Sequence, residues 1–176
     1  MIAEWHKKAG EEGVDNPFSA FVFEYLAFIA LLKTELHEGP LDRTSIQRLK
    51  QDRETREKYL KCIGNDRDLA NCWENIKREL DSKPLSKNAT SNGRFSETDL
   101  KWWNCSTLNL PTPNPRETEK RGVLKSISDW ENMVEFWYSI RNNMFHGTKN
   151  PENERDQFLV ERGYKTLNPL MDILVH

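Results

Sequence analysis

Residues 18–32 constrain the fold more than any other segment, because hydrophobic side chains recur there on nearly every face of a helix. A helix that is apolar all round must be buried on most sides. Asn16-Pro17 predicts where it begins, since Asn is a favourable N-cap and Pro is favoured in the first turn. Glu38-Gly39-Pro40 predicts where it ends. The sequence therefore predicts a central helix that other elements must cover.

The same segment is shorter than the roughly 20 apolar residues that cross a membrane, and Glu24 interrupts it. The N-terminal residues 1–8 are charged from the fourth position onward and lack the pattern of a signal peptide. We therefore expect a cytoplasmic protein that has no membrane contact.

Further segments carry apolar side chains at helical spacing, and stop signals separate them. Helices are expected at 17–37, 43–63, 69–80, 124–146 and 153–174. Asn168-Pro169 predicts a kink in the last of them. The length of 176 residues suits one domain. We expect an all-α fold, an antiparallel bundle of four to five helices without a sheet, as a single domain over residues 1–176.

Residues 81–122 follow no helical period and contain repeated Pro, Asn, Ser and Gly residues. We interpret this stretch as an irregular insertion before the penultimate helix. Residues 81–98 are expected to be the most mobile part of the chain, because their composition is polar and rich in turn-forming residues. Trp102 and Trp103 are expected to be anchored, because exposing two indole rings to water is costly.

The cysteines and histidines do not indicate a metal site. The three cysteines lack the paired spacing of a disulfide framework or a zinc knuckle. His6, His37 and His176 have no partners at ligand spacing. We therefore expect no metal and no cofactor.

The sequence Ile140-Arg141-Asn142-Asn143-Met144-Phe145-His146-Gly147 closes the fourth predicted helix, where Gly147 favours a helix end. His transfers protons near neutral pH, because its ordinary pKa is about 6.5. Arg presents a planar, permanently charged group that matches phosphate oxygens. RNA supplies its own nucleophile, the 2′-hydroxyl, so its cleavage does not require a metal. These residue types suit phosphodiester chemistry.

This segment, followed by a turn and a long last helix, resembles the motif of the HEPN family. That motif has an Arg near a helix end, a polar residue, three further residues and a His. Residues 123–176 are similar to the third and fourth helices of the family, and the first predicted helix is more loosely similar to its first. The resemblance implies a metal-independent endoribonuclease of the toxin, phage-defence or RNA-surveillance kind. It implies catalytic roles for Arg141, Asn142 and His146.

Five residues at 100° each put Arg141 and His146 about 140° apart on a straight helix. Either the helix distorts before Gly147, or a second subunit completes the site. HEPN relatives usually dimerise with two motifs facing one cleft, so the resemblance implies a homodimer acting on RNA. It also implies an antitoxin or nucleotidyltransferase partner. However, Thr148 stands where many toxin members carry the Tyr that such a partner modifies.

Other polar residues near the motif are candidates for contacts with the substrate. They are Lys149, Asn143, Lys125 and Arg121. Charged residues at this density are commonly just solvated, and Arg141 and His146 could simply interact with the helix dipole. A net charge of −2 argues against an architectural RNA-binding role. The alternative function is a non-catalytic HEPN module that binds a nucleotide, RNA or a partner protein.

Overall fold

The computed structural model describes residues 1–13, 15–37, 39, 41–85, 102–103, 106–107, 119–120, 122–145 and 150–175. This part of the chain is helical apart from one short antiparallel strand pair, β1 (Ser106–Thr107) with β2 (Glu119–Lys120). The helices are α1 (Ile2–Glu12), α2 (Pro17–Leu31), α3 (Asp42–Gln51), α4 (Arg53–Asn65), α5 (Arg67–Ser82), α6 (Trp130–Phe145) and α7 (Glu154–Val175). A π-helical turn, η1 (Leu32–Leu36), extends α2. The predicted all-helical packing is confirmed, and the strand pair corrects the expectation that no strands would form.

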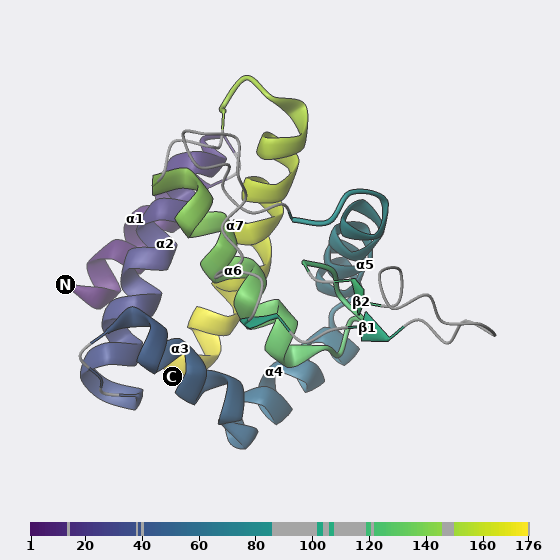
Figure 1. The fold of residues 1–176 in the computed structure, drawn as a ribbon. Coiled ribbons are helices and arrows are strands. Elements are labelled where there is room, and N and C mark those ends of the chain that lie inside the picture. The colour runs from purple at the N-terminus through teal and green to yellow at the C-terminus, as the bar shows by residue number, and fades with distance from the viewer. Residues whose placement is uncertain are drawn as a thin grey trace.

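Helix α2 is the predicted apolar helix, and it lies between α1 and the centre of the bundle formed by α6 and α7 (Figure 1). Asn16 caps it, because its side chain accepts a hydrogen bond from the backbone N–H of Ser19. Helices α1 and α7 pack along α2, and Gly163 lets α7 approach the Phe21 ring closely, since a Cβ there would lie 3.0 Å from that ring. By length and composition Pro17–Leu36 could cross a membrane, but within this fold the segment packs as a core helix.

The helices differ from the prediction in three places. Helix α1 was not predicted, and the helix expected at 43–63 is two helices, α3 and α4. The break falls at Asp52, where the backbone is extended. The Asp52 carboxylate caps α4 by accepting a hydrogen bond from the backbone N–H of Thr55 at 3.0 Å. Helix α6 begins at Trp130 and not at 124, because the Asp129 carboxylate binds the backbone N–H of Lys125 at 2.8 Å and holds a turn there.

Aromatic residues from α4, α5 and α6 fill the centre of the bundle. The ring centroid of Trp137 lies 5.7 Å from that of Tyr59 and 5.5 Å from that of Trp73. Their polar atoms are paired: the Trp73 indole donates to the Tyr59 hydroxyl at 2.9 Å, and that hydroxyl donates to the carbonyl of Thr166 at 2.6 Å. The Trp137 indole donates to the Thr166 hydroxyl at 3.0 Å. This network ties α4, α5 and α6 to α7 one turn before Pro169, which lies inside α7.

The two ends of the predicted insertion are fixed to the helices. The backbone N–H of Leu85 donates to the carbonyl of Gly122 at 3.0 Å. Gly122 has a φ of +73°, and a Cβ there would lie 2.6 Å from the Leu85 carbonyl oxygen, so only glycine fits. Trp103 is buried and donates from its indole to Ser139 at 3.3 Å, which confirms the predicted anchoring. Most of the segment expected to be mobile, 86–98, lies outside the described residues.

We expect Tyr59→Phe to lower the free energy of unfolding by about 1–3 kcal/mol, because it leaves a buried indole N–H without an acceptor. Tyr25→Phe is the matched control. Its hydroxyl is also buried, but it has no hydrogen-bond partner among the described residues. Removing it should leave the free energy of unfolding unchanged or raise it. Urea unfolding followed by circular dichroism measures both variants, and equal losses would contradict the assigned network.

Candidate functional site

Arg141 lies in the last turn of α6, at the surface near the start of α3. Its side chain is 29% exposed, and one guanidinium nitrogen, Nη2, lies 3.5 Å from a carboxylate oxygen of Asp42. The other, Nη1, donates to the side-chain oxygen of Asn142 at 2.8 Å. The guanidinium also lies 4.7 Å from the centre of the Phe145 ring. Arg141 and Asn142 are therefore brought together as a polar pair at the end of α6.

The surroundings of Arg141 are locally basic, although the chain as a whole is acidic. Asp42 binds Lys33 at 3.1 Å as well as Arg141. On the adjoining face, Glu135 binds both Arg43 and Lys50, at 2.5 and 2.6 Å. Among the described residues, four cations thus share Asp42 and Glu135 around the α3–α6 contact, and Glu131 of α6 adds a third carboxylate whose charge acts on Lys50. This excess of positive charge suits an anionic ligand.

A buried tyrosine lies beneath this cluster. The Tyr25 ring is 5.9 Å from the Arg141 guanidinium, and burial raises the pKa of its hydroxyl well above the ordinary value. The hydroxyl has no hydrogen-bond partner within the described part of the chain. An unpaired buried hydroxyl costs stability, so its presence next to the motif marks this region as a candidate for function.

Not every predicted site residue is described. His146, Lys149 and Arg121 lie outside the described residues. Asn143 lies on α6 next to Asn142 and is half-buried. Lys125 is exposed at the opposite end of α6, and the eleven helical steps from Trp130 to Arg141 alone span about 16 Å. Lys125 therefore lies apart from the residues around Arg141, and its contact with a substrate stays a prediction.

Sequence reasoning missed Lys33, Asp42 and Arg43 as neighbours of the motif. They come from η1 and from the first turn of α3, far from Arg141 in the chain. A charged first turn of a helix is common, so nothing in the sequence distinguishes Asp42 from other acidic residues. Only the packing of α3 against α6 reveals the cluster.

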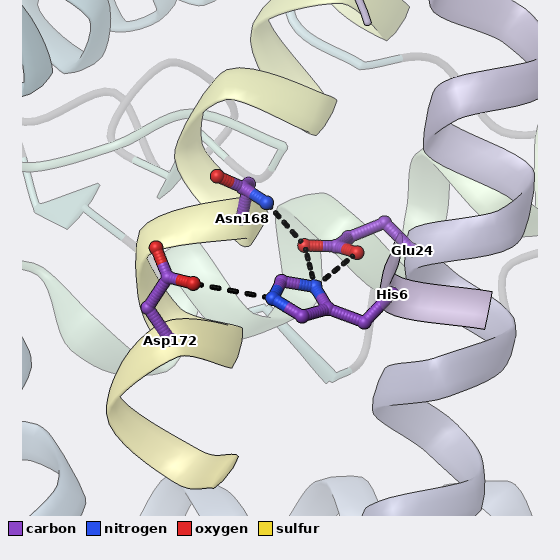
Figure 2. A network of polar contacts seen from close by, with 4 residues as sticks. All are labelled: His6, Glu24, Asn168 and Asp172. Atoms are coloured by element: carbon purple, nitrogen blue, oxygen red, sulfur yellow. Dashed lines mark hydrogen bonds and ion pairs between the residues drawn. The ribbon is translucent and has the colours of Figure 1, made fainter. Parts of the chain in front are cut away.

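A second polar cluster joins α1, α2 and α7 (Figure 2). His6 lies between two carboxylates: its Nδ1 is 2.8 Å from Glu24, and its Nε2 is 3.1 Å from Asp172. Asn168 donates to Glu24 at 2.9 Å. Glu24 is fully buried, so the contacts compensate for the loss of water around its carboxylate. This cluster fastens α1 to the bundle.

The pKa values of His6 and Glu24 in this cluster are both raised. Burial alone would lower the pKa of His6, but the hydrogen bonds and charges of Glu24 and Asp172 outweigh it and raise that pKa above its ordinary value. Burial raises the pKa of Glu24, and His6 and Asn168 offset this only in part. The folded chain therefore binds protons here more tightly than the unfolded chain does.

The described residues contain no group of three His, Cys, Asp or Glu side chains that could hold a metal ion. Comparisons of the chain with family models, with curated proteins and with solved structures give no match. The site must therefore be interpreted from its own residues.

We expect the stability of the protein to fall as the pH rises above the ordinary His pKa of about 6.5. The reason is that the raised pKa of His6 stabilises the folded state. This stabilisation is complete below pH 6.5 and is lost at higher pH, as His6 deprotonates in the folded state. The raised pKa of Glu24 acts in the same direction from about 4.5 upward. Thermal unfolding from pH 6 to pH 9 measures the slope.

His6→Gln should flatten this slope, whereas Lys7→Gln, an exposed change on the same helix, should leave it unchanged. An unaltered slope in His6→Gln would show that other groups cause the pH dependence.

Proposed function

We propose that this protein is a metal-independent endoribonuclease of the HEPN type. The observation that carries the proposal is the local positive charge around Arg141, at the end of the helix that carries the motif. A polyanion needs such a patch on a chain whose net charge is −2. An exposed fraction of 29% leaves the Arg141 side chain accessible to a phosphate group.

In this proposal Arg141 binds the scissile phosphate and stabilises the charge that develops on it. Asn142 holds the guanidinium through the 2.8 Å hydrogen bond and so orients it. The 2′-hydroxyl attacks phosphorus, the bond to the 5′-oxygen breaks, and the proton lost by the nucleophile is balanced by one gained by the leaving oxygen. His146 transfers these protons. The products are a 2′,3′-cyclic phosphate and a 5′-hydroxyl.

We further propose that the active form is a homodimer in the cytoplasm whose two motifs face one cleft. Two exposed apolar side chains occur near the motif: Phe145 contacts the Arg141 guanidinium, and Leu41 is the residue before Asp42. They are 59% and 65% exposed, which is costly for the isolated chain and favours a second copy of the same surface. Two copies of His146 would supply both a general base and a general acid.

In the same proposal, α2, α6 and α7, together with the α4–α5 pair, form the antiparallel core of a HEPN bundle, and α1 and α3 pack around it. Contacts of α2 and α6 with α7 support this arrangement. Thr148 offers no tyrosine for a nucleotidyltransferase, so such a partner or an antitoxin would have to act by another route.

A non-catalytic module that binds RNA or a nucleotide is the second candidate. The observation in its favour is that Asp42 already engages Arg141, so a phosphate must share the guanidinium with a carboxylate. Binding of RNA without cleavage would support this function and exclude the first.

We expect the purified protein to cleave single-stranded RNA in the presence of EDTA and to leave DNA intact, because DNA lacks the 2′-hydroxyl. His146→Ala should reduce the rate about 10²–10⁴-fold, since a proton-transfer group is lost. Arg141→Ala should reduce it about 10²–10³-fold. Arg53→Ala, an exposed change on α4, is the control for the loss of one positive charge.

Gel analysis of the products, with end-group determination, tests the chemistry. Wild-type turnover by His146→Ala, or loss of cleavage in EDTA, would show that the mechanism is wrong.

We expect Phe145→Glu to convert the dimer to a monomer and to abolish cleavage, because it adds a charge to a surface that the second subunit covers. Light scattering at micromolar concentration measures the mass, and Lys58→Glu on α4 is an exposed control with an added negative charge. A wild-type protein that is monomeric and active would exclude the shared cleft.

A further inference from the structure

A pocket of about 670 Å³ lies against α3, next to the basic cluster but separate from Arg141 itself. Its walls include His37 at the end of η1, Arg43, Gln47 and Gln51 on α3, and Trp102. Sites for small organic ligands in proteins commonly have volumes of about 300–1,000 Å³. The pocket is therefore large enough for a nucleobase with its sugar.

Trp102 is the aromatic residue of the pocket lining, and two cations hold it in place. The Arg43 guanidinium lies 4.8 Å from the centre of the Trp102 ring and 3.9 Å from that of Tyr138, and Glu135 fixes it by an ion pair. Lys50 donates to the backbone carbonyl of Trp102 at 2.8 Å, which fixes the backbone at this residue. Nucleobases stack on aromatic side chains held in this way.

The pocket also offers polar groups suited to a base edge. The side-chain nitrogen of Gln47 is buried and has no hydrogen-bond partner in the part of the chain that the structure describes. A base oxygen or ring nitrogen could accept from it and remove the cost of leaving it unpaired. Gln51, one turn further along α3, adds a second amide.

The charges favour an anionic ligand near one end of the pocket. Arg43 and Arg48 are both part of its lining. The acidic lining residue Asp52 lies 3.1 Å from Nε2 of His37 and also accepts from the backbone N–H of Thr55 at 3.0 Å. A second pocket, of about 370 Å³ between α5 and α7, has Arg162 and Lys165 in its lining but no aromatic residue.

We propose that the α3 pocket binds one base of single-stranded RNA, beside the nucleotide whose phosphate Arg141 contacts. Arg43, which lines the pocket, follows Asp42 directly in α3, and its guanidinium lies 3.9 Å from the centre of the Tyr138 ring, one turn before Arg141 on α6. A strand whose phosphate lies at Arg141 therefore reaches the pocket with a neighbouring base. This inference rests on the proposed function for its ligand, and the experiment separates the two.

The test uses fluorescent eight-nucleotide RNAs with 2′-O-methyl groups throughout, which bind but cannot be cleaved through the 2′-oxygen. Fluorescence anisotropy at fixed salt gives the Kd. Trp102→Ala should weaken binding about 5–150-fold, as loss of one base stack does. Trp102→Phe should retain most of the affinity, because it keeps an aromatic face. Arg53→Gln on α4 is the control outside the pocket.

Gln47→Leu is the second variant, and it should fold because it removes a buried amide nitrogen that has no partner among the described residues. It should change the order of affinities among oligomers of A, C, G and U. Wild-type Kd values in both Trp102→Ala and Gln47→Leu would overturn the pocket assignment.

Cleavage of unmodified RNA separates this inference from the proposed function. If the wild type cleaves RNA and His146→Ala does not, but the pocket variants bind normally, the pocket assignment fails alone. If the pocket variants lose affinity but the wild type cleaves no RNA, the nuclease proposal fails alone. If the wild type does not bind the oligomers, both fail.

Discussion

Glu135 is the residue on which the surface around Arg141 and the α3 pocket depends. It is buried on α6, and one of its carboxylate oxygens binds both Arg43 and Lys50 of α3. Burying one carboxylate with two cations is costly unless every charge is paired, and removal of one member of such a group typically costs about 3–5 kcal/mol. The ion pairs therefore fix α3 against α6. Lys50 and Arg43 in turn contact Trp102, so both the pocket and the residues around Arg141 depend on one buried carboxylate.

The charges explain how an acidic chain can offer an anion-binding surface. Net charge describes the long-range field, whereas a phosphate at 0.15 M salt responds to charges within a Debye length of about 8 Å. Lys33, Arg43, Lys50 and Arg141 lie around the α3–α6 contact and outnumber the carboxylates of Asp42, Glu131 and Glu135. A net charge of −2 thus limits non-specific binding without excluding a specific contact.

Helical periodicity predicted most of the bundle, because α2, α5 and α7 each present apolar residues at regular spacing to a common core. Helix α1 was missed because charged residues surround its few apolar positions, Ile2, Trp5 and Ala9, which pack on the core. The break at Asp52 and the late start of α6 were missed because single carboxylates decide them locally. In the candidate site, a sequence motif singled out Arg141 and Asn142. Asp42 could not be found in the same way, since its role arises only from packing.

The fixed ends of the insertion have a consequence for how this protein can change over evolution. Leu85 is paired with Gly122, and Trp102 and Trp103 are held by α3 and α6. The entropy of closing a loop rises only with the logarithm of its length, so added or deleted residues between fixed ends cost little. A change in the number of residues between Leu85 and Trp102 is therefore expected to leave the surface around Arg141 unchanged.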